Sequence, residues 1–283
     1  MKIIKKTKAL IFSIIFFFSC AILYAANREP MLSPRKTAFI YYDDEGTFDY
    51  CYHSLSQFFK NRNYAVQEIK ADEINSGKIL MENCEQKILA FPGGADCFYQ
   101  INLRGKGCDN IKKFVENDGT YLGVCGGSYF GTAKVEFALG LPEQVNQFRE
   151  LGFFPGIARG PAKGIFKYGD ESGASAAKIK ITSNGKIFYV YHNGGPTFVP
   201  FEDDPEFKKA DPRFKGYEVL ATFSEVEDKP AIIKCNYGKG YAILSGVHFE
   251  DSSKQCAKGI REFVASTEDV MNEFLDKIFP RQE

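Results

Sequence analysis

Short apolar runs alternate with helical stretches over the first half of the chain. Four runs have the length of a strand and lie at residues 37–42, 64–69, 87–91 and 120–124. The spacing of one helix face joins Leu55, Phe58 and Phe59 after the first run, and Ile111, Phe114 and Val115 before the fourth. Strands that alternate with helices predict a parallel sheet with helices on both faces.

The pattern of the second half changes to antiparallel hairpins. One hairpin joins residues 178–182 to 186–191 through an Asn-Gly turn, and another joins 231–237 to 241–245 through Gly-Lys-Gly. Residues 152–164 are rich in Gly, Pro and aromatic residues, which predicts a long ordered loop near the site, and 259–279 read as a helical tail. We therefore predict an α/β fold, a flavodoxin-like three-layer sandwich. Its mostly parallel central sheet has helices on both faces and added antiparallel hairpins.

The N-terminus has the pattern of an export signal. Lys2, Lys5, Lys6 and Lys8 precede an uncharged apolar run that ends near Ala26. We predict a signal peptide over residues 1–26 and a single domain over 27–283, which places the protein in the periplasm or outside the cell. An uncleaved membrane anchor is the alternative, and lipid attachment at Cys20 is a weaker one.

The composition of the chain argues against one class of partner, nucleic acids. Without the four leader lysines, 32 Lys and Arg residues face 36 Asp and Glu residues, a net charge near −4. The chain has no Trp, and no basic stripe is interleaved with aromatic residues. A nucleic-acid partner is therefore not expected.

Seven cysteines follow Cys20, an odd number for an exported chain. In an oxidising compartment this favours one free thiol, Cys125, while others pair. Cys97 could pair with either Cys108 or Cys51, and the sequence does not decide between them. Because no CxxC and no Cys/His pair at metal-ligand spacing occurs, we predict no metal site and no cofactor.

A nucleophile elbow is the strongest chemical signal. The apolar run at 120–124 ends abruptly at Cys125, and Gly126 and Gly127 open a segment that can begin a helix. Small neighbours are needed in such a turn, and amides at the start of the helix would stabilise a thiolate. A buried structural cysteine before a Gly-Gly turn explains the same residues equally well.

Two other motifs complete a reactive group. His248 and Glu250 follow the last predicted strand in an H-x-E pattern, which points both side chains the same way. A thiol nucleophile needs such a base and a carboxylate that orients it. Pro92-Gly93-Gly94 follows the strand at 87–91, so the amides of Gly93 and Gly94, with that of Gly126, could form an oxyanion hole.

In this order the motifs resemble the class I glutamine amidotransferase fold with its Cys-His-Glu triad. A narrower resemblance is to the amidotransferase-like N-terminal domain of eukaryotic-type biotin-protein ligases. It is carried by Phe91–Tyr99, Tyr121–Gly131, Ala133–Phe137, Phe153–Pro161, His192–Gly195 and Leu244–His248. Biotin attachment belongs to a separate catalytic domain in those ligases, so we do not predict biotin ligation here.

Two departures from the amidotransferase pattern bear on the substrate. Phe249 stands where class I amidotransferases usually have proline, and the Ser128-Tyr129 region replaces a glutamine that often helps to bind substrate. The predicted substrate is therefore a small molecule or peptide with an amide bond, and its identity stays open.

The leading hypothesis is a cysteine-dependent amide hydrolase with Cys125, His248 and Glu250 as its triad. The rival is a non-catalytic ligand-binding or regulatory module on the same fold. Five further polar residues are expected to line the pocket, although capping or loop hydrogen bonds explain each of them as well: Asp96, Tyr99, Glu136, Arg159 and Asn193.

Overall fold

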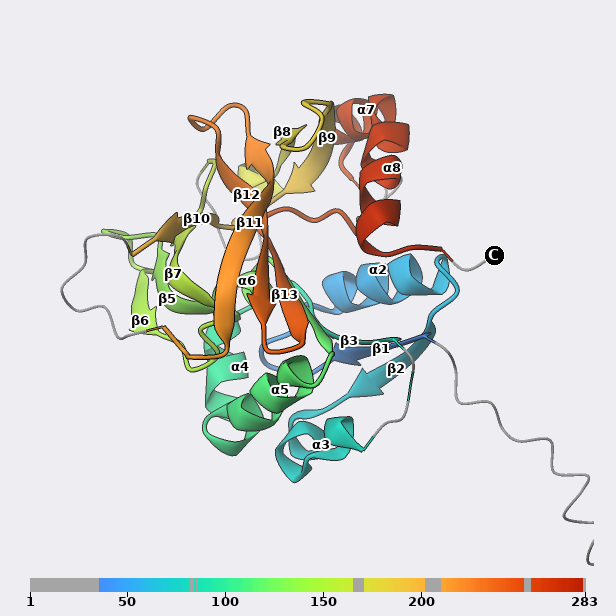
Figure 1. Ribbon diagram of the computed structural model, residues 1–283. Helices are drawn as coiled ribbons and strands as arrows, with labels where there is room; N and C mark the ends of the chain where they lie inside the picture. The colour runs from blue at the N-terminus through green and yellow to red at the C-terminus, as the bar shows by residue number, and fades with distance from the viewer. Residues whose placement is uncertain are drawn as a thin grey trace, which may run out of the picture. The chain divides into compact units, whose positions relative to one another are not determined.

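The computed structural model describes residues 36–81, 84, 86–164, 171–201, 210–251 and 256–281. From Lys36 onward these residues belong to one compact unit (Figure 1). The predicted signal peptide at 1–26 and Cys20 lie outside the described residues. Within the described ranges, no helix has both the length and the apolar character needed to cross a membrane.

The central sheet has nine strands in the order β2-β1-β3-β4-β13-β12-β11-β8-β9. The first five of these are parallel: β2 (Ala65–Ile69), β1 (Lys36–Tyr41), β3 (Gln86–Phe91), β4 (Thr120–Val124) and β13 (Gly240–Ser245). The other four continue the sheet with antiparallel pairing: β12 (Lys229–Tyr237), β11 (Phe214–Phe223), β8 (Ser175–Ile181) and β9 (Ile187–His192). The mixed α/β architecture is as predicted, but the hairpins extend the central sheet and make about half of it antiparallel.

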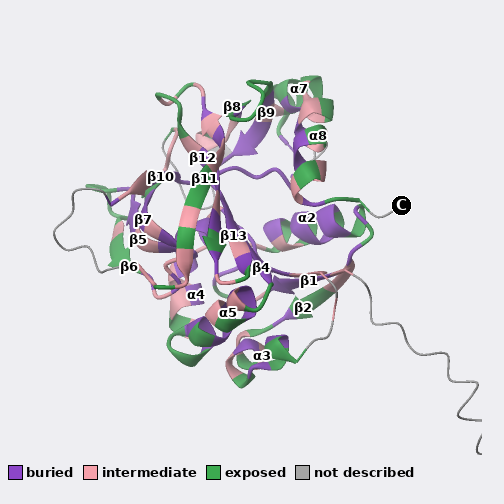
Figure 2. Cartoon of the chain, viewed as in Figure 1, coloured by how far each residue is buried: buried purple, intermediate pink, exposed green. Residues whose placement is uncertain are grey.

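Helices cover both faces of the parallel strands (Figure 1). One face carries α2 (Asp49–Lys60), and the other carries α3 (Ala71–Ser76), α4 (Asp96–Leu103) and α5 (Lys106–Glu116). The strand β1 shows why both faces are filled, since Phe39 and Tyr41 belong to one apolar cluster and Ala38 and Ile40 to the other. Side chains on a strand alternate between faces, so a wholly apolar strand needs cover on both sides. Figure 2 shows β1 buried over almost its whole length, whereas the edge strand β2 is partly exposed.

The helical tail is broken in two. It forms α7 (Lys258–Ser266) and α8 (Glu268–Ile278), which pack beside β9. Phe274 and Val264 are buried, whereas Phe263 is 53% exposed. A break at Thr267 rotates the second helix, so one continuous apolar stripe cannot describe both.

A second sheet was not predicted. Its order is β10-β7-β5-β6, formed by β5 (Thr132–Phe137), β6 (Val145–Phe148), β7 (Phe154–Gly160) and β10 (Thr197–Pro200). The segment predicted as a loop at 152–164 contains β7, which pairs with β5 and β10. Gly, Pro and aromatic content indicated irregular backbone, but pairing with segments distant in sequence imposes a strand there. Short helical turns complete the fold: α6 (Gly126–Phe130) and the 3₁₀ segments η1 (Lys78–Leu80) and η2 (Glu171–Gly173).

Candidate active site

Cys125 lies at a sharp turn between β4 and α6. Its backbone has φ 49° and ψ −106°, a conformation that residues other than glycine rarely adopt. The turn is fixed by a hydrogen bond from the Cys125 amide to the carbonyl oxygen of Ser245, at 2.9 Å. The strand, turn and helix predicted around this residue are therefore present in the structure.

The glycines around Cys125 leave no room for side chains. A Cβ atom on Gly126 would lie 2.3 Å from the carbonyl oxygen of Gly94, and one on Gly127 would lie 2.1 Å from that of Phe91. Both distances are far inside van der Waals contact with backbone, which cannot move aside cheaply. The elbow thus packs directly against the Pro92-Gly93-Gly94 turn at the end of β3.

His248 and Glu250 follow β13, the strand next to β4 in the sheet. The Nδ1 atom of His248 lies 2.8 Å from Oε1 of Glu250, and both side chains are buried. The His248 amide donates to the carbonyl oxygen of Tyr191 at 2.9 Å, which fixes the backbone at this strand end. An ionised Glu250 can only accept a hydrogen bond, so it holds the ring proton of His248 on Nδ1. Nε2 is then left for other partners.

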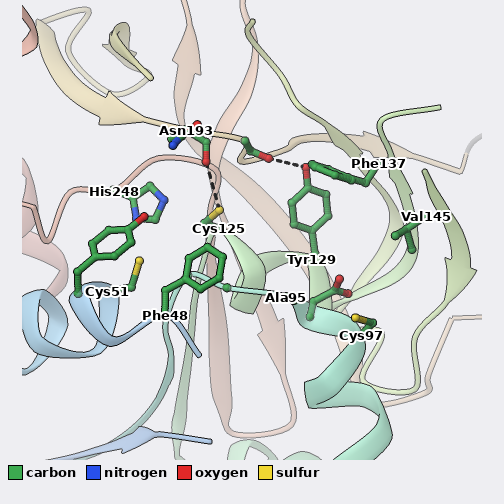
Figure 3. Close-up of a pocket in the computed structure, with 15 residues that line it drawn as sticks. Phe48, Cys51, Ala95, Cys97, Cys125, Tyr129, Phe137, Val145, Asn193 and His248 are labelled. Atoms are coloured by element: carbon green, nitrogen blue, oxygen red, sulfur yellow. Dashed lines mark hydrogen bonds between the residues drawn. The ribbon is translucent and has the colours of Figure 1, made fainter. Parts of the chain in front are cut away.

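The imidazole of His248 also interacts with two thiols, those of Cys125 and Cys51. Burial by itself would lower the pKa of His248, but the charges of Glu250 and Cys125 outweigh it and hold that pKa well above its ordinary value. Cys125 Sγ has a second polar neighbour, the carbonyl oxygen of Asn193 at 3.7 Å. Figure 3 shows Cys125, His248 and Cys51 facing one another from the elbow, the end of β13 and α2.

Cys51 is a member of this group that the sequence did not indicate. It lies in the first turn of α2, fully buried, and burial raises the pKa of its thiol to about 11 despite hydrogen bonding with His248. No spacing motif links it to Cys125 or His248. It reaches them because the turn before α2 pairs with the glycine loop, where the Phe48 amide donates to the Gly93 carbonyl oxygen at 3.2 Å.

The three predicted oxyanion residues lie beside the thiol. A Cβ atom on Gly93 would be 3.6 Å from Cys125 Cβ, and Gly94 has φ +151°, a conformation that favours glycine. Gly126 is the first residue of α6, so its amide has no acceptor one turn earlier in that helix. These backbone positions can present N–H groups to an atom bound at Cys125.

A cavity opens at Cys125. Aromatic and apolar side chains form much of its wall, namely Phe48, Tyr50, Tyr129, Phe137 and Val145, and the thiols of Cys51 and Cys97 also reach it (Figure 3). Of the five predicted pocket residues, Asp96 and Asn193 line this cavity. The wall of the cavity thus contains Cys125 and His248 together with several apolar side chains.

The other three predicted pocket residues are not among those that line this cavity. Tyr99 is fully buried and donates from its hydroxyl to the carbonyl oxygen of Pro92 at 3.3 Å. Glu136 and Arg159 form a 2.8 Å ion pair between the paired strands β5 and β7. Tyr99 thus makes the loop hydrogen bond that had been the alternative explanation, whereas Glu136 and Arg159 form a cross-strand ion pair that had not been expected.

Asp96 is held by a partner that the sequence did not reveal. Arg149 Nε lies 2.6 Å from Asp96 Oδ2, and the Arg149 side chain is buried. Burial raises the pKa of Asp96 even though Arg149 opposes the shift. Because Arg149 balances its charge, Asp96 offers the cavity a polar surface rather than a full negative charge.

His192, at the end of β9, is buried without a catalytic contact. Its Nε2 atom lies 3.1 Å from the carbonyl oxygen of Gly195, and burial lowers its pKa from 6.5 to about 4. The folded state therefore resists protonation that the unfolded chain accepts. The contribution of His192 to the free energy of unfolding is therefore fully present above pH 6.5. It falls by about 3 kcal/mol as the pH drops toward 4.

Replacing His192 by glutamine should remove that part of the acid sensitivity. Urea unfolding at pH 7, 5 and 4 should give the wild-type protein a steeper loss of unfolding free energy than His192→Gln. Equal losses in the two proteins would show that His192 takes up its proton as readily in the folded state.

None of the predicted disulfides forms among the cysteines that the structure describes. Cys51, Cys84, Cys97, Cys108, Cys125, Cys235 and Cys256 are all free thiols in the structure. Cys108 is buried in α5 and Cys51 is directed at His248, so neither forms the expected bond with Cys97. The odd count of cysteines was a compositional argument, and it carried no information on which thiols the fold brings together.

Similar proteins identify the family. A model of the family described as biotin-protein ligase, N terminal, matches residues 39–280. An uncharacterised protein of Chlamydia muridarum is 32% identical over 222 residues, which cover 76% of this chain and 81% of that protein. A biotin-protein ligase of Schizosaccharomyces pombe is 34% identical over 175 residues, 59% of this chain but only 26% of the ligase.

Solved structures with a related arrangement include a glutamine amidotransferase. It is 18% identical, with a TM-score of 0.47, and the match covers 83% of this chain and 97% of that one. The match to PurLQS from Thermotoga maritima has 12% identity and a TM-score of 0.48, and covers 84% of this chain and 99% of that one. The family match covers nearly all of the compact unit that begins at Lys36. The chain is therefore a member of the biotin-protein ligase N-terminal family.

Proposed function

We propose that this protein is a cysteine-dependent hydrolase of an amide or peptide bond. The observation that carries the proposal is the meeting of Cys125, on a strained turn, with the buried His248–Glu250 pair at the mouth of one cavity. In this proposal Cys125 is the nucleophile, His248 the general base and then acid, and Glu250 the residue that orients the imidazole.

The reaction would run in two steps. The sulfur of Cys125 attacks the amide carbon after giving its proton to His248, and the C–N bond breaks as His248 returns that proton to the leaving nitrogen. The acyl group then remains on sulfur as a thioester. Water, deprotonated by His248, attacks this thioester and releases a carboxylic acid and the thiol.

The glycine amides would stabilise the oxyanion of both steps. Gly93 and Gly94 lie in the turn after β3, and Gly126 begins the helix after β4, so their N–H groups would reach the oxyanion from two segments. Donors fixed before the reaction need no reorganisation when charge develops on the carbonyl oxygen. The apolar wall of the cavity favours a substrate with an uncharged or aromatic group beside the amide.

A panel of amides tests this proposal. Glutamine, short peptides and aromatic acyl amides would be incubated with the full chain, and the release of ammonia or amine measured. Turnover of at least one class is expected, together with an acyl adduct on Cys125 in acid-quenched samples analysed by mass spectrometry. Turnover without any adduct on Cys125, or turnover that persists in Cys125→Ser, would refute the thioester route.

A binding module is the second candidate, and one contact favours it. Cys125 Sγ lies 3.7 Å from the carbonyl oxygen of Asn193, a hydrogen bond that a thiol can donate and a thiolate cannot. A module of this kind would bind a small amide in the cavity and release it unchanged. Saturable binding of a panel member by calorimetry, with no turnover and no adduct, would support this candidate.

We also propose that residues 1–26 direct export of the protein. The support is the run of lysines followed by apolar residues. N-terminal sequencing of the protein from fractionated cells should find a new N-terminus close to residue 27 in the exported fraction. A cytosolic protein that still begins at Met1 would contradict the proposal.

A further inference from the structure

One oxygen of Asp96 has no partner on the wall of the cavity at Cys125. Arg149 Nε lies 2.6 Å from Asp96 Oδ2, and no described residue donates to the other oxygen, Oδ1. Asp96 lines the cavity, and its side chain keeps 11% of its surface exposed. Asp96 also follows Gly94 by two residues, so it is tied to the turn that packs against Cys125. Oδ1 is therefore an acceptor that a molecule bound in the cavity can reach.

Arg149 fixes the direction in which this carboxylate presents its oxygens. The Arg149 side chain is 1% exposed, and its Nη1 donates to the carbonyl oxygen of Phe148 at 3.1 Å. An arginine and a carboxylate often pair through both oxygens, but here Arg149 contacts Oδ2 alone. Nη2 of Arg149 stays buried without a partner among the described residues. The pair thus holds Asp96 in place and leaves Oδ1 for another donor.

The charges on the cavity wall are already balanced. Apart from thiols and phenols, Asp96 and His248 are the titratable side chains among the described residues that line the cavity. Arg149 and Glu250 are their counter-ions. An ammonium or carboxylate group buried here would lose its hydration without gaining a counter-ion, whereas a neutral N–H group needs only an acceptor. Much of the remaining wall is apolar, formed by Phe48, Phe137 and Val145 among others.

We infer that Asp96 determines substrate specificity by accepting a hydrogen bond from a neutral N–H group beside the scissile amide. A peptide or an acylated amino acid amide supplies this group, because one carbon atom joins its N–H to the carbonyl that is attacked. Free glutamine carries a charged amine and a carboxylate instead. This inference rests on the proposed function, since it takes the cavity at Cys125 as the substrate site.

Two amides that differ in one group test the inference. N-acetylphenylalaninamide carries the N–H group, and O-acetylphenyllactamide has an ester oxygen in its place. The wild-type kcat/KM for release of ammonia should be at least roughly tenfold higher for the first, because an ester oxygen would face Oδ1 without a proton between them. Phenylalaninamide, whose amine is charged at about pH 6.5, should also be the poorer substrate at that pH.

Asp96→Asn should remove this preference. Arg149 Nε needs an acceptor, so the asparagine oxygen should turn to Arg149 and its NH₂ group should face the cavity. The ratio of the two kcat/KM values should then fall to about one or favour the ester. A merely structural role for Asp96 would lower both values equally and keep their ratio. Glu136→Gln is the matched control, because Glu136 also pairs with an arginine but lies outside the cavity, and its ratio should equal that of the wild type.

Binding to Cys125→Ala separates this inference from the proposed hydrolysis. Calorimetry with the two amides, on Cys125→Ala and on its combination with Asp96→Asn, reports the preference without turnover. A preference for the N–H compound that the second substitution abolishes would support the inference even if the wild type hydrolysed neither amide, a result that would count against hydrolysis alone.

The comparison of ligands on a protein that keeps Asp96 remains decisive if the Asp96 variant fails to fold. Equal affinity and equal kcat/KM for the two amides, or binding of neither, would overturn the inference. So would a preference that survives in a folded Asp96→Asn protein, or phenylalaninamide binding as tightly as its acetylated form.

Discussion

Replacing Cys125 by alanine is expected to lower kcat on any amide that the protein turns over by at least ~10³-fold. The physical reason is that, in the proposed mechanism, the sulfur of Cys125 is the nucleophile and lies at the strained turn beside His248 and the glycine turn. Residual activity would come from substrate bound against those amides, without a covalent step. Initial rates at saturating substrate, with purified wild type and variant, measure the effect.

Cys97→Ala is the matched control for this prediction. Cys97 lines the same cavity, but it lies at the start of α4 and is not a partner of His248. The control should keep most of the wild-type rate. If both variants lost activity equally, the loss would be explained by a change in the shape of the cavity and not by removal of the nucleophile.

Replacing Glu250 by glutamine should lower kcat by roughly 10²- to 10⁴-fold with little change in KM. Glutamine keeps the size of the side chain but removes the charge that stabilises a protonated His248. Its amide can also donate to Nδ1 and so favour the wrong tautomer of the ring. The effect should therefore fall on the proton-transfer steps and spare substrate binding.

Asp251→Asn is the control for the Glu250 variant. Asp251 is a buried carboxylate one residue further along, and its amide, not its side chain, bonds to the His248 carbonyl oxygen. Its replacement should change kcat far less than Glu250→Gln does. Similar losses in the two variants would mean that general negative charge, and not the Glu250–His248 bond, is what matters.

The local chemistry of the site could be read from the sequence because it lies in short continuous motifs. The strand at 120–124 with its glycine turn, and the H-x-E pattern after the last strand, each encode their own backbone geometry. Parallel pairing then brings them together, since Ser245 on β13 is the partner of Val124 on β4. Strand order in a parallel sheet is enough to place Cys125 near His248.

Contacts between non-adjacent elements could not be read in the same way. Cys51 reaches His248 through pairing of the Thr47 and Gly94 segments, and Arg149 reaches Asp96 from the turn after β6. Neither pair has a characteristic spacing.

The second sheet shows that backbone structure, too, can depend on contacts between segments that are distant in sequence. Residues 152–164 carry the glycine and proline content of a loop, yet β7 is held between β5 and β10. Strand formation there depends on partners on either side rather than on local preference. Glu136 and Arg159, expected in the pocket, are instead a cross-strand pair of this sheet.

The rate at which iodoacetamide modifies each thiol of the full-length protein at neutral pH tests the central claim most directly. Peptide mapping should show Cys125 reacting roughly tenfold or more faster than Cys97, its neighbour in the cavity, because the proposed mechanism makes His248 the base for the Cys125 thiol. In His248→Ala this advantage should disappear while Cys97 reacts as before. A Cys125 thiol that reacts no faster than Cys97, or that keeps its rate without His248, would contradict the account.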